Sequence, residues 1–271
     1  MAVLDGKVVL VTGATDGLGR ALAADLARDG ATVLVHGRDP GRISDTVREV
    51  AAEASGGHVR AYQADLASLA GVRSLAEQVI AAEPRLDVLV NNAGVGAHVP
   101  GGDVRQESGD GYELRFAVNY LSGYALTKLL LPLLRASAPS RIVNVASIGQ
   151  QAIDFGDVML TSGYDGMRAY RQSKLAQILF TVDLAAELDG TGVIVNTLHP
   201  ATFMPTKIVP NPISTIAQGV EATMRLITTP EAELGTGRYF NSLEEARAND
   251  QAYDPAARRQ LRELSEKLTG L

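Results

Sequence analysis

The chain has 271 residues, 46% of them hydrophobic and 21% charged, which suits a globular protein with a sizeable core and excludes a disordered chain. It contains no cysteine, and this excludes disulfides, thiolate nucleophiles and cysteine-ligated zinc or iron–sulfur sites. A formal net charge of −6 argues against nucleic acid as a partner, because proteins that bind nucleic acid usually carry a clustered basic surface.

The N-terminal segment and the apolar runs predict neither an export signal nor a membrane anchor. Residues 1–10 include Asp5 and Lys7 and lack the long apolar stretch of a signal peptide. No apolar run reaches the roughly 20 residues that cross a bilayer, and the run at 129–134 contains Pro132. We therefore expect a soluble, cytoplasmic protein without a membrane span.

Short apolar runs alternate with segments of helical periodicity from one end of the chain to the other. The first run, residues 7–12, leads through a glycine-rich turn into a helix in which Leu18, Leu22 and Leu26 recur before Gly30 closes it. Further strands are expected at residues 32–36, 59–63, 86–90, 141–146 and 193–198. Further helices are expected at residues 39–55, 69–82, 111–136, 169–188 and 255–271.

Prolines mark several boundaries in this pattern. Asp39 and Pro40 provide an N-cap residue and a proline at the first helical position. Pro132 is expected to break the helix at 111–136, because proline lacks the N–H that a helix interior uses. Residues 202–216 have three prolines and little periodicity, and they are expected to form a mobile loop over the substrate.

The expected strands are almost entirely apolar, where strands with one solvated face would alternate. Such strands are buried on both faces, as in a parallel sheet between two helical layers. Right-handed crossovers then give a single doubly wound α/β domain of Rossmann type, with a parallel sheet flanked by helices on both faces. No linker, composition shift or repeat divides residues 1–271 into two domains.

The turn after the first strand, residues 12–19, has the sequence TGATDGLG. Its glycines permit unusual dihedral angles and close approach of the backbone to a diphosphate at a helix N-terminus. A P-loop requires glycine and lysine where Leu18 and Gly19 stand, and the G-x-G-x-x-G fingerprint requires glycine in place of Thr15 and Leu18. The turn alone is equally consistent with a strand-to-helix turn that binds no ligand.

Four motifs together resemble the short-chain dehydrogenase/reductase family. They are the TGxxxGxG turn, the NNAG run at residues 91–94, Ser147 after the fifth expected strand, and YRQSK at residues 170–174. Their order and spacing match that family over about residues 6–200. The resemblance implies a nicotinamide dinucleotide cofactor and an alcohol or carbonyl substrate, and it includes no metal.

Tyr170 and Lys174 are four residues apart and therefore share one face of a helix. A free phenol has a pKa near ~10, and a cation a few ångströms away lowers it by about 1–3 units. The resemblance implies that Tyr170 exchanges a proton with the substrate and that Lys174 supplies this cation and holds the nicotinamide ribose. It also implies that Ser147 hydrogen-bonds the reacting oxygen and that Asn119 orders a water leading to the lysine.

Other interpretations of these residues are weaker. Tyr164 is a second phenol, but the residue four positions on is Arg168, and we assign Tyr164 to the wall of the loop. A hydrolase nucleophile elbow around Ser147 requires glycine in place of Val145. Without that elbow, His199 is interpreted as a structural loop histidine. An isolated Y-x-x-x-K pair would be interpreted as an ordinary helix tyrosine with a solvated lysine beside it. The glycine turn earlier in the chain argues against that interpretation here.

The end of the second expected strand bears on the choice of cofactor. An acidic residue there would bind the adenosine ribose, whereas this chain has Gly37 and Arg38, and arginine suits a phosphate. We therefore predict NADP(H), with NAD(H) as the alternative, although Asp16 departs from the basic residue of many NADP-binding relatives. The residues expected around the cofactor are Thr12, Gly13, Thr15, Asp16, Gly17, Leu18, Gly19, His36, Arg38, Asp65, Leu66, Asn92, Ala93, Gly94, Tyr170, Lys174, Pro200, Thr202 and Thr206.

The substrate side departs from the family pattern. Ala201 replaces the usual glycine after Pro200, and either Thr202 or Thr206 could contact the nicotinamide. The long, partly apolar interval between Ser147 and Tyr170 resembles the branch of retinol dehydrogenases and carbonyl reductases, so an apolar substrate is expected.

The main hypothesis is thus an NADP(H)-dependent oxidoreductase with Tyr170 as general acid and base. The alternative is a catalytically idle NADP(H)-binding sensor or scaffold on the same fold. The resemblance also implies pairing as a homodimer or homotetramer through the helices at 111–136 and 169–188.

Overall fold

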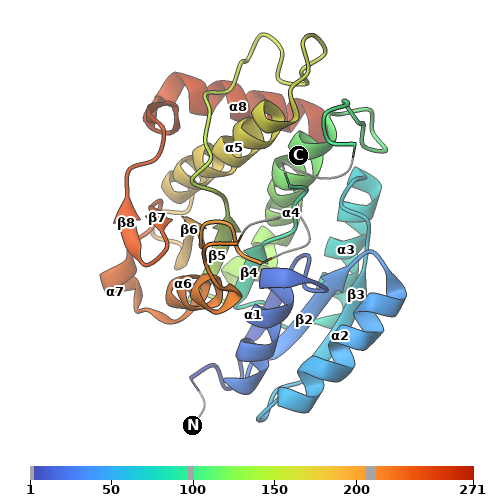
Figure 1. The fold of residues 1–271 in the computed structure, drawn as a ribbon. Coiled ribbons are helices and arrows are strands. Elements are labelled where there is room, and N and C mark those ends of the chain that lie inside the picture. Colours follow the sequence, from blue (N-terminus) through green and yellow to red (C-terminus); the bar gives the residue numbers. More distant parts are fainter. Residues whose placement is uncertain (1–2, 97–100, 206–211) are drawn as a thin grey trace.

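The computed structural model describes residues 3–96, 101–205 and 212–271. Within them a sheet of eight strands has the order β3-β2-β1-β4-β5-β6-β7-β8 (Figure 1). The strands are β1 (Val8–Val11), β2 (Thr32–Gly37), β3 (Val59–Gln63), β4 (Val88–Asn91), β5 (Ser140–Val145), β6 (Val193–His199), β7 (Tyr239–Asn241) and β8 (Glu244–Ala246). The helices are α1 (Gly17–Arg28), α2 (Pro40–Glu53), α3 (Leu69–Ala82), η1 (Phe116–Leu121), α4 (Ser122–Ala136), α5 (Gly166–Glu187), α6 (Ile216–Thr228), α7 (Glu231–Leu234), η2 (Asp250–Tyr253) and α8 (Pro255–Thr269).

The sheet is buried on both faces, as the apolar strands predicted. Along β1, Leu10 belongs to the core under α3, α4 and α5, whereas Val9 and Val11 belong to the core under α1 and α6. Successive side chains of a strand point to opposite faces, so an all-apolar strand supplies both cores. The predicted doubly wound α/β fold is confirmed, with β1 to β7 parallel.

The sheet has two strands that the sequence pattern did not predict. β7 pairs in parallel with β6, and β8 returns antiparallel to β7 through a turn in which Ser242 has a φ of 56°. Each strand has three residues, too few for a periodicity to be recognised. They extend the sheet on the side of β6.

The predicted break at Pro132 is wrong. α4 continues through Pro132 to Ala136, and Leu130, Leu131 and Leu134 on its buried side pack in the core. Only one backbone hydrogen bond is given up at the proline, and the packing of the leucines outweighs that loss. The helix also begins later than predicted, because Gly111 has a φ of 80° and the first turns form the π-helix η1.

α5 begins at Gly166, three residues before the predicted start, because Asp165 caps it by accepting a hydrogen bond from the Arg168 N–H at 2.7 Å. Residues 172–181 of α5 are buried on all sides. α8 runs beside α5 (Figure 1) and confirms the predicted amphipathic tail helix. Pairing of two chains through α4 and α5 stays a prediction.

The C-terminal end of the predicted loop at 202–216 belongs to a helix terminus. Thr215 and Gln218 form a capping box at the start of α6. The predicted mobility of the loop stays a prediction, and Thr206 lies outside the described residues. Among the residues that the structure describes, no helix is both long and apolar enough to span a membrane.

Candidate active site

The motif residues converge at one edge of the sheet. β1, β4, β5 and β6 are parallel neighbours, so their carboxyl ends meet at the same edge. The glycine turn follows β1, the NNAG run begins in β4, Ser147 follows β5, and Pro200 follows β6. α5 brings Tyr170 and Lys174 to this edge.

The glycine turn is packed too tightly for side chains at two positions. A Cβ on Gly13 would lie 2.9 Å from the Ala93 Cα atom, and Gly13 has a φ of 65°. A Cβ on Gly19 would lie 2.4 Å from the Gly13 carbonyl oxygen and 2.5 Å from the Asn92 amide nitrogen. Both positions therefore require glycine to bring the backbone of the turn against the NNAG run.

Thr12 and Asn92 hold the turn and the NNAG run together. The Thr12 hydroxyl accepts hydrogen bonds from the N–H groups of Asn92 (2.9 Å) and Ala93 (3.0 Å) and donates one to the Val90 carbonyl (3.2 Å). The Asn92 side chain donates to the Thr12 carbonyl at 2.8 Å. These hydrogen bonds fix the backbone that leads into the N-terminal end of α1, where Leu18 is buried.

His36 supports the turn from behind. Its Nδ1 accepts the Gly13 N–H at 3.1 Å, and its Nε2 lies 3.2 Å from the Ala64 carbonyl oxygen. Burial lowers the pKa of His36 to about 4, so the ring is neutral at physiological pH. With both nitrogens engaged inside the protein, His36 positions the Gly13 N–H of the turn, and its expected place around the cofactor stays a prediction.

The outer rim of the turn carries two arginines. Arg38 follows β2 with its side chain exposed, and its carbonyl accepts a hydrogen bond from Gln63. Arg42, which the sequence did not single out, donates to the Thr15 carbonyl at 3.1 Å and pairs with Asp16 at 2.7 Å. Asp16 also accepts the Gly17 N–H at 2.9 Å and so caps α1.

The predicted residues after β3 and β4 border the same region. Asp65 accepts the Ala67 N–H at 2.9 Å, and Leu66 is buried next to Ala93 at a small cavity behind the edge. A Cβ on Gly94 would lie 3.7 Å from the Lys174 Nζ atom. The NNAG run thus reaches the lysine of the YRQSK motif.

Ser147 and the Tyr170 phenol meet beside Gly149. The Ser147 Oγ accepts the Gly149 N–H at 3.0 Å, and a Cβ on Gly149 would lie 3.4 Å from that Oγ and 3.9 Å from the Tyr170 ring. Burial raises the pKa of Tyr170, and its hydrogen bond with Ser147 lowers it. The net direction is upward, so the predicted lowering by Lys174 is not what the isolated chain shows.

Lys174 is directed into the protein, below the Tyr170 ring. Its Nζ lies 5.9 Å from the centroid of that ring and donates hydrogen bonds to the Val145 carbonyl at 2.8 Å and to the Gln177 Oε1 at 3.0 Å. Burial lowers the pKa of Lys174 to about 7. Gln177 was missed by the sequence analysis, although its place one helical turn after Lys174 was a usable signal.

Asn119 lies in η1, and π-helical turns are frequent at functional sites. Its Oδ1 accepts the Val95 N–H at 2.6 Å, and its Nδ2 donates to the Val95 carbonyl (3.1 Å) and to the Ser173 Oγ (2.9 Å). Ser173 in turn donates to the Tyr170 carbonyl at 2.7 Å. Asn119 therefore links the loop after β4 to α5.

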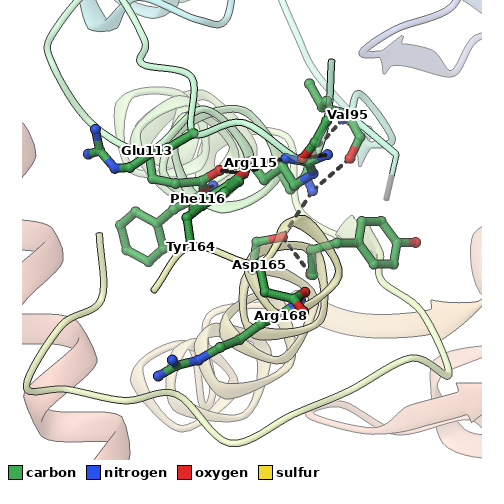
Figure 2. A network of polar contacts seen from close by, with 12 residues as sticks. Val95, Glu113, Arg115, Phe116, Tyr164, Asp165 and Arg168 are labelled. Atoms are coloured by element: carbon green, nitrogen blue, oxygen red, sulfur yellow. Dashed lines mark hydrogen bonds and ion pairs between the residues drawn. The ribbon is translucent and has the colours of Figure 1, made fainter. Parts of the chain in front are cut away.

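Three polar side chains, the buried Glu113 and Arg115 and the half-buried Tyr164, fasten the loop before α5 to the start of η1 (Figure 2). The Tyr164 hydroxyl donates to Glu113 at 2.9 Å and accepts from Arg115 at 2.6 Å. Arg115 also donates to the carbonyl groups of Gly96 at 3.1 Å and Gly102 at 3.2 Å. Tyr164 is thus a structural residue of the loop, in agreement with the expectation.

Pro200 and Thr202 follow β6. The Thr202 hydroxyl lies 2.9 Å from the His199 Nε2. Burial and the nearby Lys174 charge lower the pKa of His199 to about 4. This neutral histidine has a structural contact, as expected for a loop residue.

The geometry fits a dinucleotide. Positions 13 and 19 form a cradle without side chains, the α1 N-terminus faces it, and the two arginines stand on its rim. Thr12, Gly13, Gly17 and Gly19 would hold the diphosphate, and Asn92, Gly94 and Lys174 would lie along the nicotinamide half. When bound, a nicotinamide cofactor supplies or accepts a hydride.

Comparison with known proteins agrees with this geometry. The family model for short chain dehydrogenase matches residues 7–214. Retinol dehydrogenase 14 of Mus musculus is 38% identical over 99% of this chain and 87% of its own length. Retinol dehydrogenase 13 of Homo sapiens is 36% identical over 100% of this chain and 86% of its own length.

Solved structures with the same fold include a protein of Mycobacterium paratuberculosis, with a TM-score of 0.81, 30% identity, and coverage of 98% of this chain and 94% of that one. Another is Pseudomonas aeruginosa RhlG in an active-site complex with NADP, with a TM-score of 0.71, 29% identity, and coverage of 88% of this chain and 95% of that one.

Proposed function

The chain belongs to the short-chain dehydrogenase family, and from that premise we propose that it moves hydride between NADP(H) and an apolar alcohol or carbonyl compound, with Tyr170 as general acid and base. Action on alcohol or carbonyl groups with a nicotinamide cofactor follows from the family and the retinol dehydrogenase relatives. The observation that carries the rest is the meeting of Ser147, Tyr170 and Lys174 at the carboxyl edge of the sheet.

Tyr170 donates its proton to the carbonyl oxygen during reduction and takes it back during oxidation. Burial raises the pKa of this phenol, which keeps it protonated and ready to donate. Ser147, which already shares a hydrogen bond with the phenol, donates to the same substrate oxygen and stabilises the charge that develops there. Lys174, whose Nζ lies 5.9 Å from the centroid of the Tyr170 ring, binds the ribose hydroxyls of the cofactor with its ammonium.

The preference for NADP(H) is supported by the rim of the cradle. Residues 37 and 38 are glycine and arginine, and the carboxylate of Asp39 is engaged with the Arg42 N–H at the start of α2. The two residues that end β2 and follow it therefore carry no carboxylate, Asp39 is turned to the start of α2, and Arg38 offers a cation to a 2′-phosphate. RhlG, and a short chain dehydrogenase of Shigella flexneri, have structures with NADP.

An apolar substrate is supported by exposed apolar side chains on the loops at this edge. Ile148 follows Ser147 and is 53% exposed, and Phe203 follows β6 and is 57% exposed. Phe203 has a φ of 48°, a conformation that costs a bulky residue energy, and its carbonyl accepts the Ile213 N–H at 3.1 Å. Exposed apolar side chains held in this way suit contact with an apolar ligand.

The test is a screen for NADPH oxidation over aldehydes, ketones and quinones of increasing chain length, followed by Tyr170→Phe with the best substrate. We expect kcat to fall about 10²–10⁴-fold, the usual contribution of a general acid. NADPH binding, followed by the fluorescence of the bound cofactor, should remain nearly unchanged. Turnover that persists in Tyr170→Phe, or tight NADPH binding without turnover of any compound, would contradict the proposal.

A further inference from the structure

A small cavity lies next to Gln177, the residue whose Oε1 accepts a hydrogen bond from Lys174. It has a volume of about 10 Å³, close to the room that one water molecule needs, and Asn91, Ser122 and Gln177 are among its lining residues. Asn91 and Gln177 are each 4% exposed. Polar cavities of this size in proteins hold water when two or more hydrogen-bonding groups face them.

The orientation of the Gln177 amide is fixed by its neighbour. An ammonium group only donates hydrogen bonds, so the atom that faces the Lys174 Nζ at 3.0 Å is the Oε1 of Gln177. The Nε2 of Gln177 then faces away from Lys174. Among the described residues that amide nitrogen has no hydrogen-bond partner, so the lining of the cavity includes a free donor.

The orientation of the Asn91 amide follows from a chain of hydrogen bonds that ends at a backbone carbonyl. Thr181 donates its hydroxyl proton to the Gln177 carbonyl at 2.8 Å and therefore accepts from the Asn144 Nδ2 at 2.9 Å. The Asn144 Oδ1 then accepts from the Asn91 Nδ2 at 2.9 Å, and Asn91 also donates to Thr127 at 3.0 Å. The Asn91 Oδ1 is left buried without a partner among the described residues.

The cavity is thus lined by residues with one unused donor and one unused acceptor. We propose that a single water molecule binds there, accepting from the Gln177 Nε2 and donating to the Asn91 Oδ1, and that it makes Gln177 a positioning residue for Lys174. The second proton of the water can go to the Ser122 Oγ, whose own proton is donated to the Val118 carbonyl at 2.8 Å. The water thereby satisfies the buried acceptor and locks the amide.

The proposal rests on the proposed function only in that Lys174 serves the reaction. Two of the three protons of Nζ go to the Val145 carbonyl and the Gln177 Oε1, which leaves one for a ligand at the carboxyl edge. Among the described residues, Gln177 is the one side chain that accepts a hydrogen bond from Nζ. The titratable groups that face Lys174 are Tyr170 on its own helix and His199 at the end of β6, and neither bears a negative charge at neutral pH.

The ammonium of Lys174 is therefore stabilised by neutral dipoles, and Gln177 supplies one of them. Burial already lowers the pKa of Lys174 to about 7, and loss of this dipole should lower it further because the charged form loses a stabilising contact. A carboxylate in the same place should have the opposite effect. The direction of the two shifts distinguishes a positioning residue from a residue that only fills space.

The test follows the titration of Lys174 by NMR in the full chain with lysines labelled at the Cε carbon. The sequence has five lysines, and the Lys174→Arg variant assigns the signal. We expect Gln177→Leu to move the midpoint down and Gln177→Glu to move it up by about 1–3 pH units. Gln172→Leu is the matched control, since Gln172 is a buried glutamine of the same helix that donates to the Ala152 carbonyl at 2.9 Å. This variant should leave the titration midpoint of Lys174 unchanged.

Asn91→Leu tests the water. It removes the acceptor and fills the cavity, so the midpoint should move in the same direction as in Gln177→Leu while the Gln177 side chain is still present. A midpoint that is unchanged in Gln177→Leu would overturn the proposal, and so would a high-resolution crystal structure that shows the cavity dry. Because the titration needs neither substrate nor turnover, its failure in an active enzyme would leave the proposed function intact, and an inactive enzyme would leave the titration valid.

Discussion

The two sides of the carboxyl edge of the sheet are held together by different kinds of contact. On the cofactor side, the glycine turn and the NNAG run fit together through backbone contacts that tolerate no Cβ at positions 13 and 19. On the side of the proposed chemistry, side chains from η1, α5 and the loops are joined by buried hydrogen bonds. The first side is specified by a local sequence, and the second requires the fold to be complete.

The largest effect is expected on the side built from side chains. Arg115→Met removes a guanidinium that is 2% exposed, takes away the cation paired with Glu113, and leaves the Tyr164 hydroxyl and two loop carbonyls without this donor. Removing one partner of a buried ion pair costs about 3–5 kcal/mol, and urea unfolding should show a loss of that size. Tyr164→Phe, which keeps both charges, should cost less, about 1–3 kcal/mol.

The Arg115→Met variant tests whether the network holds the loop before α5 in place. If Arg115→Met unfolds at the same urea concentration as the wild-type chain, the network does not hold the loop to η1. If the variant is destabilised while NADPH still binds with unchanged affinity at low temperature, cofactor binding at the glycine turn is independent of the side-chain network.

The same difference explains which features could be predicted from sequence. The glycine turn and the apolar strands are each set by residues within one short segment, and a local pattern was enough to locate them. Glu113 contacts Tyr164, 51 residues away in the sequence, and no local pattern indicates that pairing. Gln177 lies one helical turn after Lys174, but its burial, which makes the contact matter, depends on the packing of α5. Pro132 shows the converse, because a local rule predicted a break and long-range packing of leucines outweighed it.

His36 illustrates what the sequence could not show about a residue that it singled out. Its position at the end of β2 placed it among the residues around the cofactor, but position alone could not show which way the ring turns. The structure directs the ring to the Gly13 N–H and the Ala64 carbonyl, where burial lowers its pKa to about 4. Direction and burial of a side chain depend on neighbours that a single sequence does not order in space.

A smaller effect on stability, with a larger one on binding, is expected on the cofactor side. Gly19→Ala places a methyl group 2.4 Å from the Gly13 carbonyl oxygen, and overpacking of this kind costs about 1–3 kcal/mol. The backbone of the turn must shift to relieve the clash, so NADPH titration should show a strongly weakened complex. Gly56→Ala is the control, since a Cβ there meets nothing within 4 Å, and it should bind NADPH normally. Normal binding by Gly19→Ala would show that the turn does not cradle the diphosphate.

The smallest effect is expected at the rim, where Arg38 is exposed and its charge acts through solvent. Arg38→Asp exchanges a cation for an anion beside the expected 2′-phosphate, so the ratio of kcat/KM for NADPH to that for NADH should fall by about tenfold or more, equivalent to about 1.4 kcal/mol. Arg48→Asp offers a control, because Arg48 is an exposed arginine of α2 that pairs with Asp45 within the helix. The ratio of kcat/KM for NADPH to that for NADH should fall in Arg38→Asp and remain unchanged in Arg48→Asp. An unchanged ratio in Arg38→Asp would remove Arg38 from the phosphate site and leave the glycine turn, with Arg42 beside it, as the basis of cofactor binding.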